Sequence, residues 1–275
     1  MAQLIGIPLV KKGRVGDFTF YQRDDQVMVR SRYNEAHQQR TLSEKQVRQC
    51  CRMGNLVTLW QRFPRGQRPT FEQRRKGTSD YNLFVTYAMQ AHPVYLSRQA
   101  SHDRACVLTD VLVSQGSLSE ISVGHDGTAP ITSIRLGGLT ISESTTVRQF
   151  AKAVIRNNYD YRHGDSLRYY LGEQRWVDNE AKPDVTMRCT ELVLDLDDDT
   201  PLRLATGDSP GFAQRGGWLA ASREVVGGMA WVHLRHGSGG TLLSTQRMVC
   251  HNDEMMSRYG SEEAFDEAYE SYKGN

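Results

Sequence analysis

The chain has 275 residues, enough for one large domain or two ordinary ones, and its 39% hydrophobic and 24% charged residues are typical of a folded protein. The net charge of +2 hides an uneven distribution. Residues 1–80 contain 16 basic and 7 acidic residues, a net charge of +9, whereas the other 195 contain 18 basic and 25 acidic residues, a net charge of −7. A basic segment beside an acidic one indicates binding to nucleic acid or to an acidic partner.

The number of cysteines and the hydropathy of the sequence indicate the cellular compartment of the protein. The five cysteines are odd in number and lack the spacing of metal or disulfide sites, which is typical of a reducing compartment. No stretch of about 18 apolar residues occurs, so no membrane-spanning helix is expected. At the N-terminus Lys11 and Lys12 follow the apolar residues, the reverse of the order in a signal peptide. We therefore expect a cytoplasmic protein with no membrane partner.

The first predicted element is a β-hairpin over residues 17–33. Aromatic and apolar residues alternate with polar ones on both sides of a turn at residues 23–25. Alternate side chains of a strand share a face. One face is then formed by Phe18, Phe20, Val27 and Val29. The opposite face carries Tyr21, Arg30 and Arg32.

A helix is predicted from the capping box at residues 41–44 (TLSE) to about Phe63. The Thr hydroxyl and the Glu carboxylate of such a box satisfy free amides at a helix start, and Pro64 cannot continue the helix. Shorter helices are expected after Thr70 and from Ser79 to about His92. Helical spacing places on one apolar face Cys50, Met53, Val57 and Trp60. It places on a basic face Lys45, Arg48 and Arg52.

From about residue 93 the chain changes to short β-branched runs bounded by glycine or aspartate, a pattern typical of sandwich-like β structure. The runs are residues 105–114, 117–124, 131–136, 139–142, 166–171, 184–195, 218–222, 228–236 and 241–250. Two helices are expected among them, one from Ser261 and one over residues 146–157, with an apolar stripe of Val147, Phe150, Ala151 and Val154. The predicted fold class is α+β: a basic head of hairpin and helices over residues 1–92, then a β-rich, sandwich-like body over residues 93–275 with two packed helices.

The candidate binding residues are arginines of the head, because a planar guanidinium donates two hydrogen bonds to one phosphate group. Stacking on unpaired bases is expected from the interleaved Tyr21, Tyr33, Phe71 and Tyr81. The same arginines also fit a solvated surface or a surface that docks on an acidic protein. The eight candidates are Arg30, Arg32, Arg48, Arg52, Arg65, Arg68, Arg74 and Arg75.

Several motifs resemble catalytic or metal sites and fail on chemical grounds. In residues 207–211 (GDSPG) the residue after the serine would have to donate its amide to an oxyanion, and Pro210 has no amide hydrogen. The acidic residues Asp195, Asp197, Asp198 and Asp199 are not followed by the glycine and distal glutamate of a calcium loop. His233 and His236, three positions apart in a predicted strand, point to opposite faces. No catalytic residue, metal site or cofactor is predicted.

Short sequence features along nearly the whole chain resemble those of an uncharacterised family of hypothetical proteins from Bacteroidota. They are residues 13–18 (GRVGDF), 29–32 (VRSR), 79–85 (SDYNLFV), 113–118 (VSQGSL) and 244–246 (STQ). The family usually has glutamine at the position of Glu44, and either side chain completes a capping box. The N-terminal hairpin and helix are also similar to those of phage-associated proteins. The resemblance implies a shared lineage, but it does not indicate a particular activity.

These features together predict a non-enzymatic binding protein whose head engages nucleic acid or another polyanion. The alternative is a structural subunit of a phage-like or other cytoplasmic assembly, in which the basic head of one copy docks on the acidic body of the next. Self-association is expected in that case. An enzyme whose site is assembled from scattered residues is a third alternative.

Overall fold

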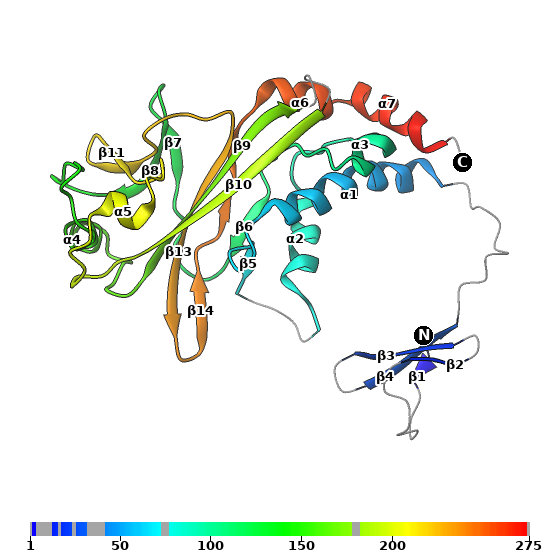
Figure 1. Cartoon of the computed structure of the whole chain (residues 1–275), viewed down its shortest axis with the longest axis horizontal. Coiled ribbons are helices and arrows are strands. Elements are labelled where there is room, and N and C mark those ends of the chain that lie inside the picture. Colours follow the sequence, from blue (N-terminus) through cyan, green and yellow to red (C-terminus); the bar gives the residue numbers. More distant parts are fainter. Residues whose placement is uncertain are drawn as a thin grey trace.

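A computed structural model of the chain describes residues 2–3, 13–15, 18–23, 26–31, 42–72, 77–177 and 182–273. The fold is α+β and β-rich, as predicted, with mostly antiparallel sheets and helices mixed along the chain (Figure 1). No described helix is both long and apolar enough to cross a membrane. The helices are α1 (Glu44–Arg62), α2 (Asp80–Ala88), α3 (Arg98–His102), α4 (Val147–Asn157), α5 (Leu202–Thr206), α6 (Asp253–Tyr259) and α7 (Glu262–Lys273).

The N-terminal sheet consists of β1 (Ala2–Gln3), β2 (Gly13–Val15), β3 (Phe18–Arg23) and β4 (Gln26–Ser31), in the order β1-β4-β3-β2. Strands β3 and β4 form the predicted hairpin, with Phe20 opposite Val29 and Thr19 opposite Arg30. Side chains directly opposite each other in an antiparallel pair share a face. The register therefore confirms a Phe/Val face and a second face that carries Tyr21 with Arg30.

The central sheet is antiparallel, and both of its faces are buried. Its strands are β9 (Ser166–Val177), β10 (Lys182–Val193), β13 (Gly227–Gly237), β14 (Gly240–Leu243) and β16 (Val249–His251). Successive side chains of β9 and β13 point to opposite faces of the sheet and enter two different cores. Tyr169 and Trp231 belong to the first core, and Tyr170 and Val232 belong to the second. For this reason β13 is buried at its first eight positions.

The first core lies between the central sheet and a smaller sheet with helices α4 and α5 (Figure 1). The smaller sheet has the order β11 (Ala213–Arg215), β12 (Trp218–Ala220), β8 (Pro130–Arg135), β7 (Val123–His125). Helix α4 begins with a capping box of Thr146 and Gln149. Its buried stripe is the predicted one and consists of Val147, Phe150, Ala151 and Val154.

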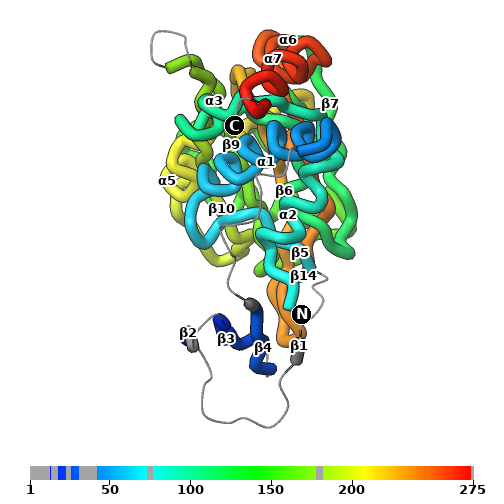
Figure 2. The backbone as a smooth tube through the Cα atoms, turned by 90° about the vertical axis from the view of Figure 1, so that its right-hand side faces the viewer, coloured from blue at the N-terminus to red at the C-terminus, as the bar shows by residue number. Residues whose placement is uncertain are grey.

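The second core corrects the predicted boundary at residue 92. Helices α1 and α2 cover the other face of the central sheet, so Leu59, Phe63 and Phe84 share one core with Tyr170 and Val232 (Figure 2). A three-stranded sheet of β15 (Gln246–Arg247), β6 (Leu112–Gln115) and β5 (Thr70–Phe71) completes it. Helices α1 and α2 therefore belong to the core of the body. The cause is long-range apolar contact, which the charge imbalance of the chain does not reveal.

The capping box that begins helix α1 lies two residues later than predicted. The box is formed by Ser43 and Gln46, and the helix ends before Pro64 as expected. This helix buries Val47, Cys51 and Leu59, so Cys51 faces the core and Cys50 is only half-buried. Two overlapping S/T-x-x-E/Q patterns offer alternative starts, and the tertiary packing of the apolar residues selects the second.

Residues 105–110 cross the interior without belonging to a strand, although a strand is predicted over 105–114. Side-chain amides take the place of strand partners there. Asn55 donates to the Val107 carbonyl at 2.9 Å and accepts from the Val107 amide at 2.8 Å. Gln174 accepts from the Leu108 amide at 2.8 Å, and Asn252 donates to the Leu108 carbonyl at 2.8 Å. Buried backbone groups need such partners, so these amides fix α1 and the central sheet on one segment.

Candidate anion-binding site

Two of the arginines predicted to bind a polyanion, Arg48 and Arg52, form hydrogen bonds to other parts of the same chain. Arg48 of α1 donates to both carboxylate oxygens of Glu262 in α7, at 2.9 and 2.8 Å, and its Cζ lies 3.8 Å from the centroid of the Phe265 ring. The Arg48 hydrogen bonds lower the pKa of Glu262. Arg52 donates to the backbone carbonyl of Met89 at 2.6 Å. Both side chains hold α1 against neighbouring elements. No local pattern indicates the partner of Arg48, because Glu262 lies 214 positions away.

Arg65 and Arg68 contribute to a surface at the end of α1. The helix ends at Arg62, before Pro64, and the chain turns back so that Arg68 Cζ lies 5.2 Å from the ring centroid of Trp60. Tyr81, in the first turn of α2, meets Trp60 edge-on, with 5.6 Å between ring centroids. Both rings are half-buried and Arg65 is exposed. We call these four residues, Trp60, Arg65, Arg68 and Tyr81, the Trp60 surface.

The Trp60 surface has positive charge that is not neutralised by the described part of the chain. Neither Arg65 nor Arg68 has a carboxylate partner among the described residues, unlike Arg62, which pairs with Asp184 at 2.6 Å. Phe71, a predicted stacking residue, is 2% exposed, so its ring cannot stack on a base. Its alternating position in β5 directs it into the second core.

The other predicted binding residues lie elsewhere. Arg30 is exposed in β4, and its Cζ is 6.0 Å from the ring centroid of Tyr21, consistent with the shared face of the hairpin. The structure thus places Arg68 beside Trp60, with the exposed Arg65 three positions earlier in the same turn, and leaves Arg30 on a separate sheet. Outside the described residues lie Arg32, Arg74, Arg75 and the stacking candidate Tyr33.

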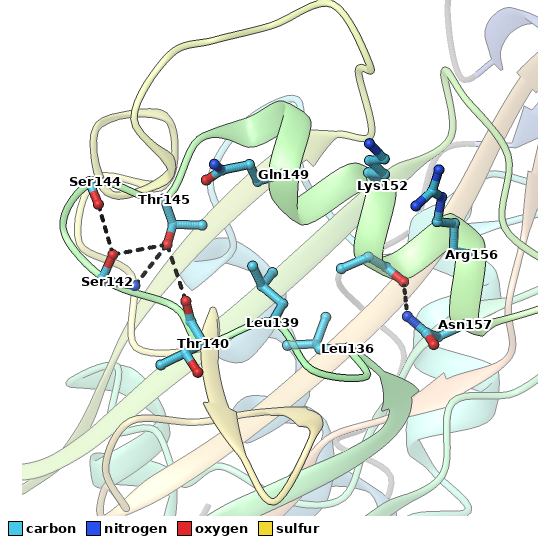
Figure 3. A pocket seen from close by; sticks show the side chains of 11 residues that line it. Leu136, Leu139, Thr140, Ser142, Ser144, Thr145, Gln149, Lys152, Arg156 and Asn157 are labelled. Atoms are coloured by element: carbon cyan, nitrogen blue, oxygen red, sulfur yellow. Dashed lines mark hydrogen bonds between the residues drawn. The ribbon is translucent and has the colours of Figure 1, made fainter.

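A second cationic feature is a hollow of about 500 Å³ between α4 and the loop at residues 136–145 (Figure 3). Lys152 and Arg156, one turn apart on α4, line it together with the apolar Leu139 and hydroxyl groups of the loop. No carboxylate lines this hollow, and neither cation has an ion-pair partner in the described ranges. We did not predict it. The signal in the sequence is that α4 has four Lys, Arg or Gln side chains and no acidic residue.

His233 and Asp165 form a histidine–carboxylate pair that resembles a catalytic dyad. His233 Nε2 lies 2.8 Å from Asp165 Oδ2, and Arg235 holds the same carboxylate at 2.9 and 2.8 Å. His233 is 0% exposed and its ring stacks on Tyr161 at 4.2 Å between centroids. A reactant cannot reach a ring enclosed in this way, so the cluster stabilises the fold.

Because burial lowers the pKa of His233, the stability of the protein is expected to depend on pH. Below the ordinary histidine pKa of about 6.5 the unfolded chain takes up a proton that the folded chain does not, so the free energy of unfolding falls as pH falls. The contribution of one such group is at most about 1.4 kcal/mol per pH unit. Urea unfolding at pH 7.5 and 5.5 measures it. In His233→Gln this part of the pH dependence is expected to disappear, and an unchanged dependence would contradict the assignment.

Residues distant in the sequence form two histidine–carboxylate groups that no linear motif predicts. One contains His125, Glu224 and His251, and the other contains His163 with Asp195 and Asp197. In residues 207–211, the rejected nucleophile motif, Gly207 ends α5 in the left-handed region, with φ of 59°. Comparisons with family models, with curated proteins and with solved structures gave no match to this chain.

Proposed function

We propose that this chain is a non-enzymatic binding protein for nucleic acid or another polyanion, and that the Trp60 surface is a contact site. The observation that carries the proposal is the position of uncompensated Arg68 beside the half-exposed ring of Trp60, which meets Tyr81 edge-on, with exposed Arg65 in the same turn. Three of the four residues of the Trp60 surface lie within residues 1–80, of which 16 are basic.

The chemistry of this surface suits a single strand. Guanidinium groups donate paired hydrogen bonds to phosphate oxygens, and aromatic rings stack on unpaired bases whatever their sequence. Trp60 has a fixed orientation because its ring also contacts Phe84, with centroids 5.2 Å apart. A fixed ring loses little conformational entropy on binding.

The test is a fluorescence-anisotropy titration of a labelled single-stranded oligonucleotide at two salt concentrations. Binding is expected to weaken steeply with salt, because each phosphate contact releases counterions. Arg65→Gln/Arg68→Gln should weaken binding and reduce the slope of log K against log salt by about 1.4, since each contact to a single strand contributes roughly 0.7.

Lys152→Gln/Arg156→Gln is the matched control, because it removes the same charge from the hollow beside α4. It should leave the affinity nearly unchanged. Absence of binding at both salt concentrations, or loss of binding in the control alone, would refute the proposed site. If Arg65→Gln/Arg68→Gln instead abolished self-association in light scattering and left oligonucleotide binding intact, the surface would serve an assembly.

A further inference from the structure

We propose that His125, Glu224 and His251 form a binding site for a first-row divalent metal ion of the zinc type. The three residues come from different parts of the fold: His125 ends β7, Glu224 lies before β13, and His251 ends β16. Strand β16 pairs with the start of β13, where Gly227 lies opposite His251. The antiparallel pairing therefore brings His251 close to the loop that carries Glu224.

The separations in this group fit a shared ion better than direct hydrogen bonds. Glu224 Oε1 lies 3.5 Å from His125 Nε2 and 3.3 Å from His251 Nδ1. Nitrogen–oxygen hydrogen bonds have a usual length of 2.7–3.2 Å. Two ligands that are each about 2.1 Å from a tetrahedral zinc ion are separated by about 3.4 Å. One ligand atom from each of the three residues lies within 4.8 Å of the others.

Among the described residues, Glu224 has no lysine or arginine partner that would compete with a metal ion. Its neighbour Arg223 is directed to Glu173, with the nearest nitrogen–oxygen distance 3.3 Å. Among the described residues, the groups within ion-pair distance of Glu224 are the two imidazoles. On the other ring, His251 Nε2 is buried without a hydrogen-bond partner within the described ranges. A coordinate bond at Nδ1 leaves the ring proton on this Nε2, so coordination also has a cost at His251.

Coordination has one identifiable cost at His125. The Gly127 amide donates to His125 Nδ1 at 2.9 Å, so the neutral ring carries its proton on Nε2. To bind a metal through Nε2 the ring must carry that proton on Nδ1 instead, and the Gly127 hydrogen bond is lost. Gly127 lies in an exposed turn, and a hydrogen bond of this kind contributes only about 1 kcal/mol. Metal–ligand bonds offset a loss of this size.

The ligand set determines the class of metal. Two imidazoles and one carboxylate suit Zn²⁺ and its first-row neighbours, whereas Mg²⁺ and Ca²⁺ prefer oxygen ligands. The side chains of His125, Glu224 and His251 are 31%, 46% and 32% exposed, so water has access to complete the coordination. Three protein ligands with one open position is a known arrangement for zinc.

The second group has a different local structure and is a suitable control. His163 faces Asp195 through Nδ1, and the same atom accepts the Leu196 amide at 3.2 Å. Asp195 Oδ1 accepts the Asp197 amide at 2.8 Å. The backbone thus occupies the atoms that would bind a metal, and the group has only one imidazole. We do not propose a site there.

The experiment is isothermal titration of Zn²⁺ into the full chain after treatment with a chelator, with Mg²⁺ as the comparison ion. One Zn²⁺ per chain is expected, with no heat of binding for Mg²⁺. Glu224→Gln and His251→Ala should weaken Zn²⁺ binding by more than the roughly 10–100-fold typical of an outer-shell residue. His163→Ala should bind as the original chain does.

Glu224→Gln changes only charge at a half-exposed position, so it is expected to remain folded, which circular dichroism checks. Tight Zn²⁺ binding should also raise the midpoint of thermal unfolding of the original chain and of His163→Ala but not of Glu224→Gln. Absence of Zn²⁺ binding would overturn the proposal. So would unchanged affinity in Glu224→Gln and His251→Ala, or loss of affinity in His163→Ala.

Discussion

Asp165→Ala is expected to lower the free energy of unfolding by about 3–5 kcal/mol, the usual cost of removing one partner from a buried ion cluster. Asp165 is 2% exposed and accepts hydrogen bonds from Arg235 and from the Arg162 amide, the latter at 2.9 Å. Without the carboxylate, Arg235 loses its ion pair and His233 loses the partner of its Nε2. Urea unfolding at neutral pH measures the change.

The position of Asp165 extends the effect beyond one ion pair. Its backbone carbonyl accepts from the Leu194 amide at 2.7 Å, just after β10, and its side chain binds Arg235 in β13. Burial alone would raise the pKa of Asp165, but hydrogen bonds from Arg235 and His233 lower it. Its stabilising contribution is therefore present above the ordinary aspartate pKa of about 3.9 and is lost as pH falls below it.

Glu270→Ala is the control for this prediction. Glu270 pairs with Lys273 on the exposed face of α7, one turn away. Exposed helix pairs contribute roughly 0.3–0.5 kcal/mol. A loss below 1 kcal/mol in Asp165→Ala would show that the cluster does not stabilise the fold in this way.

Local patterns in the sequence predicted the elements whose cause is local. The stripe of α4 follows from helical spacing, and the hairpin of β3 and β4 follows from alternation on both sides of a turn. The end of α1 follows from Pro64, which lacks an amide hydrogen. The start of α1 was predicted from a capping box at residues 41–44, whereas the box is formed two positions later by Ser43 and Gln46.

The helices predicted to belong to a separate head share a core with the central sheet, because net charge carries no information about which residues are buried. Arg62 of α1 binds Asp184 of β10, while Leu59 of the same helix enters the core against the central sheet. Arg48 finds its carboxylate in α7, at the other end of the chain. Composition identified a cationic segment, but it could not show which cations the fold itself neutralises.

Sites built from distant residues depend on strand order, which the sequence did not specify. His251 belongs to no metal-binding motif of the linear sequence. The partner of His251 in the proposed metal site is Glu224, which becomes a neighbour only because β16 pairs with the start of β13. The hollow beside α4 could have been anticipated, because a helix with Lys152 and Arg156 and no acid is visible in the sequence.

Gly227→Ala is expected to destabilise the protein by about 3–5 kcal/mol, as the sum of backbone strain and steric overlap. Gly227 has φ of 139°, a conformation that L-residues rarely adopt. A Cβ at this position would lie 1.9 Å from the Gly172 carbonyl oxygen and 2.9 Å from the Gln174 amide nitrogen. Both atoms are backbone, so neither can rotate away as a flexible side chain would.

Relief of this overlap requires a shift of β9 relative to β13, whose pairing runs from Gly227 opposite Glu173 to Leu234 opposite Ser166. That shift would disturb Tyr169 and Trp231, the large side chains that the pairing places in the first core. Gly124→Ala is the control, because Gly124 also lies in a strand, β7, and a Cβ there would meet nothing within 4 Å. Alanine removes unfolded-state entropy at such a position, so no loss of stability is expected. Urea unfolding of both variants separates the effect of a methyl group from the effect of its position: equal stabilities would show that the close approach of β9 and β13 tolerates a side chain.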